Sequence, residues 1–199
     1  MKSIIRPEDF NLSNYNFDSA YFVLATPGQI IPSIFDNRDN ICFINFPFKE
    51  AIKTPSYIQK IGKKPAKQIL EEIRSLISPK IKINPDGYFA HVIIGLFNEL
   101  RVNDTILLET SGLSSESIVE LMRLSMEITG ISNHKKIFII DVSNISSSQE
   151  LDITIYKIDQ QLIDEVAAKG LNNFTDRKAE SVFPSSNLFK SRGKTLLRS

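Results

Sequence analysis

The feature that most constrains the fold is the regular alternation of short apolar runs and helical segments between Thr105 and Gly170. Residues 105–108 and 136–142 are predominantly apolar segments with the length of buried strands. Residues 115–129 lie between them, have apolar side chains at helical spacing and are followed by Gly130, which we expect to end that helix. This order predicts an α/β fold in which helices cover a sheet that is at least partly parallel.

The remaining chain extends the same pattern. We expect further strands at 21–25 and 41–46, and helices at 66–77, 88–100 and 159–169. Residues 151–158 alternate apolar and polar side chains, which predicts a strand with one wet face at an edge of the sheet. Its orientation is left open, with antiparallel pairing as one option. The prediction is thus a mixed sheet of about five strands with an irregular arm at residues 1–19.

The helical and strand patterns fade after Leu171. Residues 175–199 are rich in Ser, Lys and Arg and contain only isolated apolar residues, which is typical of an extended or mobile tail. We therefore predict one α/β domain at 1–174 and a basic tail at 175–199.

Composition narrows the function classes. A chain of 199 residues with 42% hydrophobic residues can bury a full core without disulfides or metals. One Cys and two His argue against a Cys- or His-rich metal site. Residues 1–9 have no apolar stretch typical of a signal peptide, and no apolar run approaches the length of a membrane span. We therefore expect a cytoplasmic protein with no transmembrane segment.

The net charge of +1 conceals strong local imbalance. Residues 53–82 carry eight basic and two acidic side chains, whereas residues 83–175 carry six basic and thirteen acidic ones. The segment 176–199 is again basic, with six basic and two acidic side chains. Such asymmetry favours contacts with charged partners.

Sequence motifs for catalysis are absent. The chain contains no G-x-x-x-x-G-K-[ST], G-x-G-x-x-G, H-E-x-x-H or G-x-S-x-G pattern. His91 falls within an apolar helix, His134 within a turn and Cys42 within an apolar strand, so we interpret all three as structural. We predict no catalytic residue, no metal and no cofactor.

One loop supports an alternative. Residues 105–116 run from a strand through a small polar loop to a helix N-terminus, a geometry that can hold an anion. This stretch resembles the acidic strand of nucleotide-hydrolysing ATPases, but Leu108 precedes Glu109 and the matching phosphate loop is missing. A degenerate nucleotide- or phosphate-binding enzyme would use Glu109, Ser111, Gly112, Ser114 and Asp141. Glu109 and Asp141 would converge if their strands are parallel neighbours.

The leading hypothesis is a non-enzymatic protein-binding module: an adaptor, a chaperone or a subunit of a larger assembly. Its partner is a protein or protein complex rather than nucleic acid. The expected docking surfaces are the 151–158 strand and a set of basic and apolar residues, namely Lys60, Lys63, Lys64, Lys67, Lys190, Arg192, Lys194, Leu196 and Leu197. A second alternative, a nucleic-acid accessory protein, would use the basic 53–82 segment.

Overall fold

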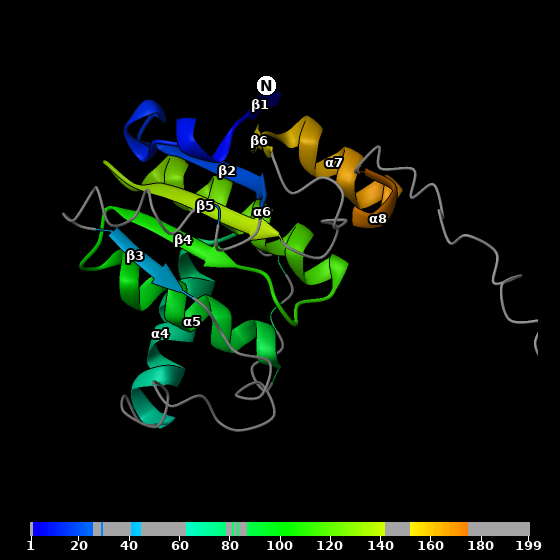
Figure 1. Cartoon of the computed structure of the whole chain (residues 1–199). Coiled ribbons are helices and arrows are strands. Elements are labelled where there is room, and N and C mark those ends of the chain that lie inside the picture. The colour runs from blue at the N-terminus through cyan, green and yellow to red at the C-terminus, as the bar shows by residue number, and fades with distance from the viewer. Residues whose placement is uncertain are drawn as a thin grey trace, which may run out of the picture.

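A six-stranded mixed sheet forms the centre of the structure, a computed structural model that describes residues 2–25, 29, 41–44, 63–78, 81, 83, 87–141 and 152–174. The strand order is β1-β6-β2-β5-β4-β3 (Figure 1). The strands are β1 (Lys2–Ile5), β2 (Ser19–Leu24), β3 (Ile41–Ile44), β4 (Thr105–Glu109), β5 (Lys136–Asp141) and β6 (Ile153–Lys157). The predicted fold class is confirmed, with one strand more than expected.

Strands β2, β5, β4 and β3 are parallel neighbours, whereas β6 runs antiparallel to both β2 and β1. Every residue of β2, β4 and β5 is buried, as their largely apolar sequences favour, and the polar residues Ser19, Thr105, Glu109, Lys136 and Asp141 at their ends are buried as well. Strand β6 instead alternates buried and partly exposed residues and therefore has the predicted wet face.

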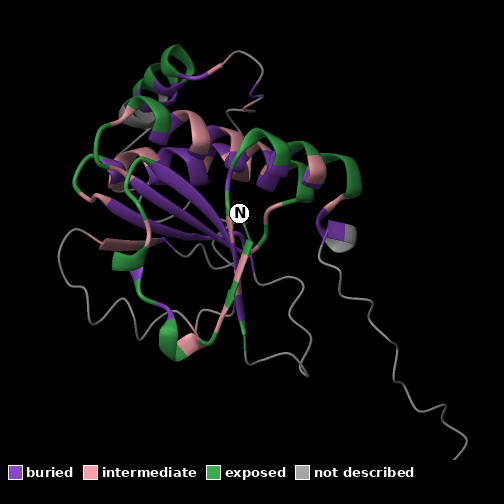
Figure 2. Cartoon of the chain, turned by 90° about the horizontal axis from the view of Figure 1, so that it is seen from above, coloured by how far each residue is buried: buried purple, intermediate pink, exposed green. Residues whose placement is uncertain are grey.

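The helices cover one face of the sheet (Figure 2). They are α4 (Lys63–Leu76), α5 (Tyr88–Leu100), α6 (Ser115–Ile131), α7 (Gln160–Lys169) and α8 (Leu171–Phe174). The chain steps from β3 to β4 to β5 in one direction across the sheet. Because parallel crossovers are right-handed, successive steps in one direction place their helices on the same face.

Local sequence signals set three of the ends of helices α6 and α7. The Ser114 hydroxyl accepts a hydrogen bond from the Ser117 amide at 3.3 Å and caps α6, and Asp159 caps α7 by accepting from the Leu162 amide at 2.8 Å. Gly170 ends α7 with φ 71°, a conformation that favours glycine. The expectation that Gly130 ends α6 was wrong, since the helix continues to Ile131.

Strand alternation divides the core into two layers. Phe22, Ile106 and Ile139 face the helices, whereas Tyr21 and Phe138 face the opposite side. On that second side the N-terminal arm covers part of the sheet with two 3-10 turns, Pro7–Asp9 and Leu12–Asn14. The arm is therefore an ordered layer.

Lys136 fastens this arm to the sheet. Its buried ammonium donates hydrogen bonds to the carbonyls of Leu12 and Tyr15, both at 2.7 Å, and lies 4.3 Å from the centre of the Phe17 ring. Burial lowers the pKa of Lys136, because desolvation disfavours its charged form. The two carbonyls and the ring are what make the charge tolerable there.

The predicted edge position of the 151–158 strand was wrong. Strand β6 lies between β1 and β2, so its two neighbours occupy both hydrogen-bonding edges. The residues that pair with it, Lys2–Ile5, fall in the segment that we expected to be irregular. The tail predicted at 175–199 lies outside the described residues.

Candidate binding surface at the β1 edge

The strand-end loop favoured by the enzyme alternative connects β4 to α6. The Thr110 hydroxyl donates to Asp141 Oδ1 at 2.9 Å, and the Thr110 amide continues the ladder to the Ile140 carbonyl at 3.0 Å. Gly112 adopts φ 83° in the turn that brings the chain to the α6 cap. The local architecture of strand, polar loop and capped helix is therefore present as expected.

The structure does not direct Glu109 and Asp141 to the same side. Strands β4 and β5 are parallel neighbours, but Glu109 is in register with Ile140, and Asp141 lies one residue further on. Successive residues of a strand point to opposite faces. Asp141 therefore points to the helix face with Ile139, and Glu109 leaves its strand on the face of Leu107.

The hydroxyl groups of this loop bind within the loop or to its strands. Ser111 Oγ donates to Glu109 Oε1, and Ser114 Oγ serves as the α6 cap. Glu109 is 7% exposed, and its second oxygen, Oε2, accepts no hydrogen bond from the residues the structure describes. A buried carboxylate next to the loop amides repels a phosphate, so this geometry gives the nucleotide alternative little support.

Tyr88 joins α5 to this loop. Its hydroxyl donates to the Ser111 carbonyl at 3.2 Å. Burial, with a smaller contribution from the negative charge of Glu109, raises the pKa of Tyr88 to about 12. The loop is thus braced by an aromatic side chain that stays protonated across the physiological range.

The cysteine and the two histidines have the surroundings of residues that support the fold. Burial, aided by Glu99, raises the pKa of the Cys42 thiol to about 12, which makes it a poor nucleophile. The His134 ring stacks on Phe17 with centroids 3.7 Å apart, and His91 is half-buried on α5. Over the described ranges, no group of three or more His, Cys, Asp or Glu side chains could hold a metal ion.

Most of the predicted basic docking residues fall outside what the structure describes. Lys63, Lys64 and Lys67 belong to α4, but only their backbone is described. The others lie in segments that are not described, namely Lys60, Lys190, Arg192, Lys194, Leu196 and Leu197. The basic surface therefore stays a prediction.

A surface that the sequence did not reveal lies at the opposite sheet edge from β3. Strand β1 ends the sheet and has one neighbour, β6, among the described strands (Figure 1). Lys2 pairs with Tyr156 and Ile4 with Thr154, so these four side chains share the helix face. Ile4 is 61% exposed although it is a β-branched apolar residue in a strand. This edge thus offers both main-chain groups and apolar surface.

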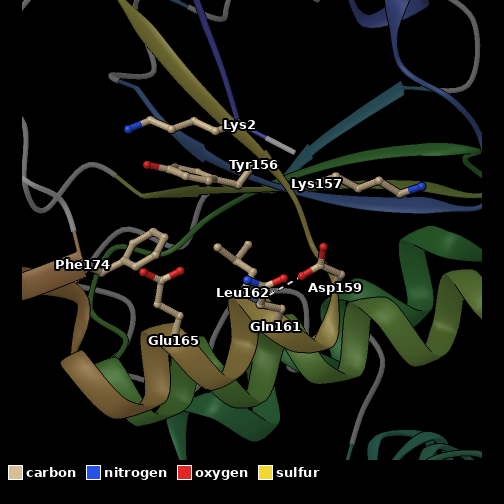
Figure 3. A pocket seen from close by; sticks show the side chains of 8 residues that line it. All are labelled: Lys2, Tyr156, Lys157, Asp159, Gln161, Leu162, Glu165 and Phe174. Atoms are coloured by element: carbon tan, nitrogen blue, oxygen red, sulfur yellow. Dashed lines mark hydrogen bonds between the residues drawn. The ribbon is translucent and has the colours of Figure 1, made fainter.

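A pocket of about 330 Å³ lies beside this edge, between the β1–β6 pair and helices α7 and α8. Figure 3 shows Leu162 at its centre, with Tyr156 and Phe174 on one side and Asp159 on the other. The Tyr156 and Phe174 rings are tilted by 55° with centroids 5.2 Å apart. Gln161 and Glu165 from α7, together with Lys2 and Lys157, complete the lining.

The charged side chains that line this pocket differ in whether they have an oppositely charged or hydrogen-bonding partner. Asp159 is used as the α7 cap, and Glu165 Oε1 binds Lys169 Nζ at 2.6 Å. Lys2 lies 5.6 Å from the centre of the Tyr156 ring, and Lys157 extends in the opposite direction (Figure 3). Neither lysine forms an ion pair with any residue within the described ranges. Of the two lysines, Lys2 therefore shares the face of the pocket and lacks a carboxylate partner among the described residues, whereas both carboxylates of the pocket are engaged.

Other exposed apolar side chains lie at the amino ends of the parallel strands. Val102 lies two residues after the end of α5 and is 69% exposed, and Ile131 is the last residue of α6 and is 60% exposed. Leu76, at the end of α4, is also exposed. These residues offer side chains alone, because they lie at helix ends and not on an open strand.

No protein-family model, curated protein or solved structure matches this chain. Within the described residues, none of the helices combines the length and hydropathy that crossing a bilayer requires.

Proposed function

We propose that this protein is a protein-binding module that docks an extended segment of its partner along β1. The observation that carries the proposal is that β1 is the last strand of the described sheet. Its residue Ile4 has a largely exposed side chain. An edge strand presents unpaired amide and carbonyl groups, which an incoming strand can pair with. The module would act as an adaptor, a chaperone or a subunit of a larger assembly.

The neighbouring pocket supports the same proposal. In strand addition, main-chain hydrogen bonds supply affinity and pockets for alternate side chains supply specificity. Here the pocket lies on the face that Lys2 and Ile4 share, so side chains on that face of a docked segment point toward it. The single cysteine fits a reducing compartment, and we extend the proposal to the cytoplasm.

Natural edge strands are protected by charges, proline, bulges or short length. Strand β1 has one lysine and four residues, and the apolar Ile4 lies at its centre. That combination limits uncontrolled aggregation and still permits a specific partner.

Affinity capture with variants tests the proposal. The full chain is the bait in native extract at near-physiological salt, and Ile4→Asp is compared with Val102→Asp, which places the same charge at an equally exposed apolar residue far from β1. We expect the Ile4→Asp bait to lose the partner that the unaltered and Val102→Asp baits retain. Equal capture by all three baits, or capture by none, would contradict the proposal.

A further inference from the structure

We propose that the segment docked on β1 runs antiparallel and carries an acidic side chain opposite Lys2 and an apolar side chain opposite Ile4. This inference rests on the proposed function and specifies its partner. Read from its N-terminus, the segment has the pattern apolar–x–acidic. Antiparallel pairing is chosen because it is slightly more stable per residue than parallel pairing.

The spacing follows from the register of β1. Lys2 and Ile4 lie two residues apart, on the same face as Tyr156 and Thr154. Residues directly opposite each other in an antiparallel pair also share a face, with Cβ atoms about 5 Å apart. Two side chains of the docked segment, themselves two residues apart, therefore contact Lys2 and Ile4.

The acidic preference follows from Lys2. Its side chain lines the pocket and has no carboxylate partner in the described part of the chain. The two carboxylates of the pocket are held by the Leu162 amide and by Lys169. An acidic side chain opposite Lys2 gains an oppositely charged cross-strand neighbour, whereas a basic one meets like charge.

The apolar preference follows from Ile4. Its 61% exposure leaves a β-branched side chain facing water at the sheet edge. A β-branched or aromatic residue opposite it removes apolar surface of both side chains from water. Thr154, on the other side of Ile4, is partly buried and lies on the same face.

A second copy of β1 does not satisfy these requirements. The strand reads Lys2-Ser3-Ile4-Ile5 and contains no carboxylate, so a paired copy offers Lys2 no opposite charge. In an isologous antiparallel pair centred on Ser3, Lys2 lies opposite Ile4 of the other copy. The chemistry of the edge thus favours a different chain over self-association.

Selection from a displayed peptide library tests the inference. The biotinylated full chain selects from strand-length peptides that are random at alternate positions, and the same selection is repeated with Lys2→Glu, Ile4→Asp and Arg101→Glu. Arg101→Glu is the control, because it makes the same charge change at an exposed residue directly after α5, where it also removes the ion pair with Glu72. Size-exclusion chromatography with light scattering measures the mass of each chain.

We expect peptides with the apolar–x–acidic pattern to be enriched by about three-fold or more over their basic counterparts, the preference of one cross-strand charge pair. Lys2→Glu should invert the preference to basic residues, and Arg101→Glu should leave it unchanged. An unchanged acidic preference with Lys2→Glu, or a dimer that Ile4→Asp dissociates, would overturn the inference and leave strand docking standing. Peptides that bind the unaltered chain and Ile4→Asp equally would overturn the proposed function itself.

Discussion

The strand-end loop and the β1 edge differ in how their polar groups are used. In the loop, Thr110 donates to Asp141 and Ser111 donates to Glu109, so the hydroxyls hold the chain together. At the β1 edge, Lys2 has no carboxylate partner within the described ranges, and the outer side of the strand ends the sheet. The comparison shows that the polar side chains of a conspicuous sequence motif can be used to hold the fold together. A short strand without any motif can instead offer unpaired main-chain groups and a charged side chain to a partner.

The largest expected effect is on the loop side of this comparison. Asp141 is 1% exposed, and Asp141→Ala leaves the buried Thr110 hydroxyl without its acceptor. We expect the free energy of unfolding to fall by about 3 kcal/mol. Asp141→Asn retains an acceptor oxygen and should lose much less. Urea denaturation of both variants is the measurement, and equal losses would show that the hydrogen bond to Thr110 is not what the carboxylate supplies.

A second prediction concerns Lys136, whose ammonium group, like the hydroxyl groups of the loop, forms hydrogen bonds within the fold. Lys136→Met keeps most of the side-chain volume and removes the ammonium group, so the carbonyls of Leu12 and Tyr15 both lose their donor. We expect a loss of about 2 kcal/mol, with faster proteolysis of the arm than of the helices. A variant as stable as the unaltered chain would mean that the desolvation that lowers the Lys136 pKa outweighs these hydrogen bonds.

Alkaline pH tests the contact between α5 and the loop that the Tyr88 hydroxyl makes. The pKa of Tyr88 is raised from 10.0 to about 12 in the folded chain, so the unfolded chain releases this proton first as pH rises. The contribution of Tyr88 to stability is therefore complete below pH 10 and is lost between pH 10 and about 12. Tyr88→Phe should cost about 1 kcal/mol at neutral pH, the value of one hydrogen bond.

The control for this experiment is Tyr15→Phe. The pKa of Tyr15 is also raised to about 12, by burial and by Tyr21, but Tyr15 lies in the arm and not at the loop. Each variant should flatten part of the decline in stability above pH 10. A Tyr88→Phe variant with the same alkaline decline as the unaltered chain would contradict the proposed environment of Tyr88.

The smallest expected effect is at the β1 edge. Because Ile4 is largely exposed, Ile4→Asp should change the free energy of unfolding by less than about 0.5 kcal/mol. Thermal or urea denaturation of the isolated chain is the measurement. A large loss would mean that Ile4 supports the fold, and its effect on partner capture would then have a structural cause.

The sequence predicted the fold class because its signals are local. The mainly apolar segments at 105–108 and 136–142 are strands that neighbour each other in parallel, and the local residues Ser114, Asp159 and Gly170 lie at helix ends. Strand β1 gives a weak signal, since four residues with two adjacent isoleucines fit no clear period. Its pairing with β6 joins segments about 150 residues apart, and local patterns do not encode such contacts.

The candidate sites show the same limit. The sequence predicted a strand, a loop and a helix at residues 105–129, but the register that separates Glu109 from Asp141 depends on how two strands align in space. The alternation in 151–158 correctly indicated one wet face, but an edge position depends on whether another strand pairs there. The sequence signal for Lys2 and Ile4 is a short segment in which a basic and an apolar residue alternate, which could pair with that wet strand.

Amide hydrogen–deuterium exchange tests the central claim most directly. The captured partner is added to the full chain, and exchange is followed in the peptides that contain Lys2–Ile5 and Arg101–Asp104. Strand docking predicts slower exchange in Lys2–Ile5 when the partner is bound and no change in Arg101–Asp104. Unchanged exchange in Lys2–Ile5, with protection elsewhere, would contradict it.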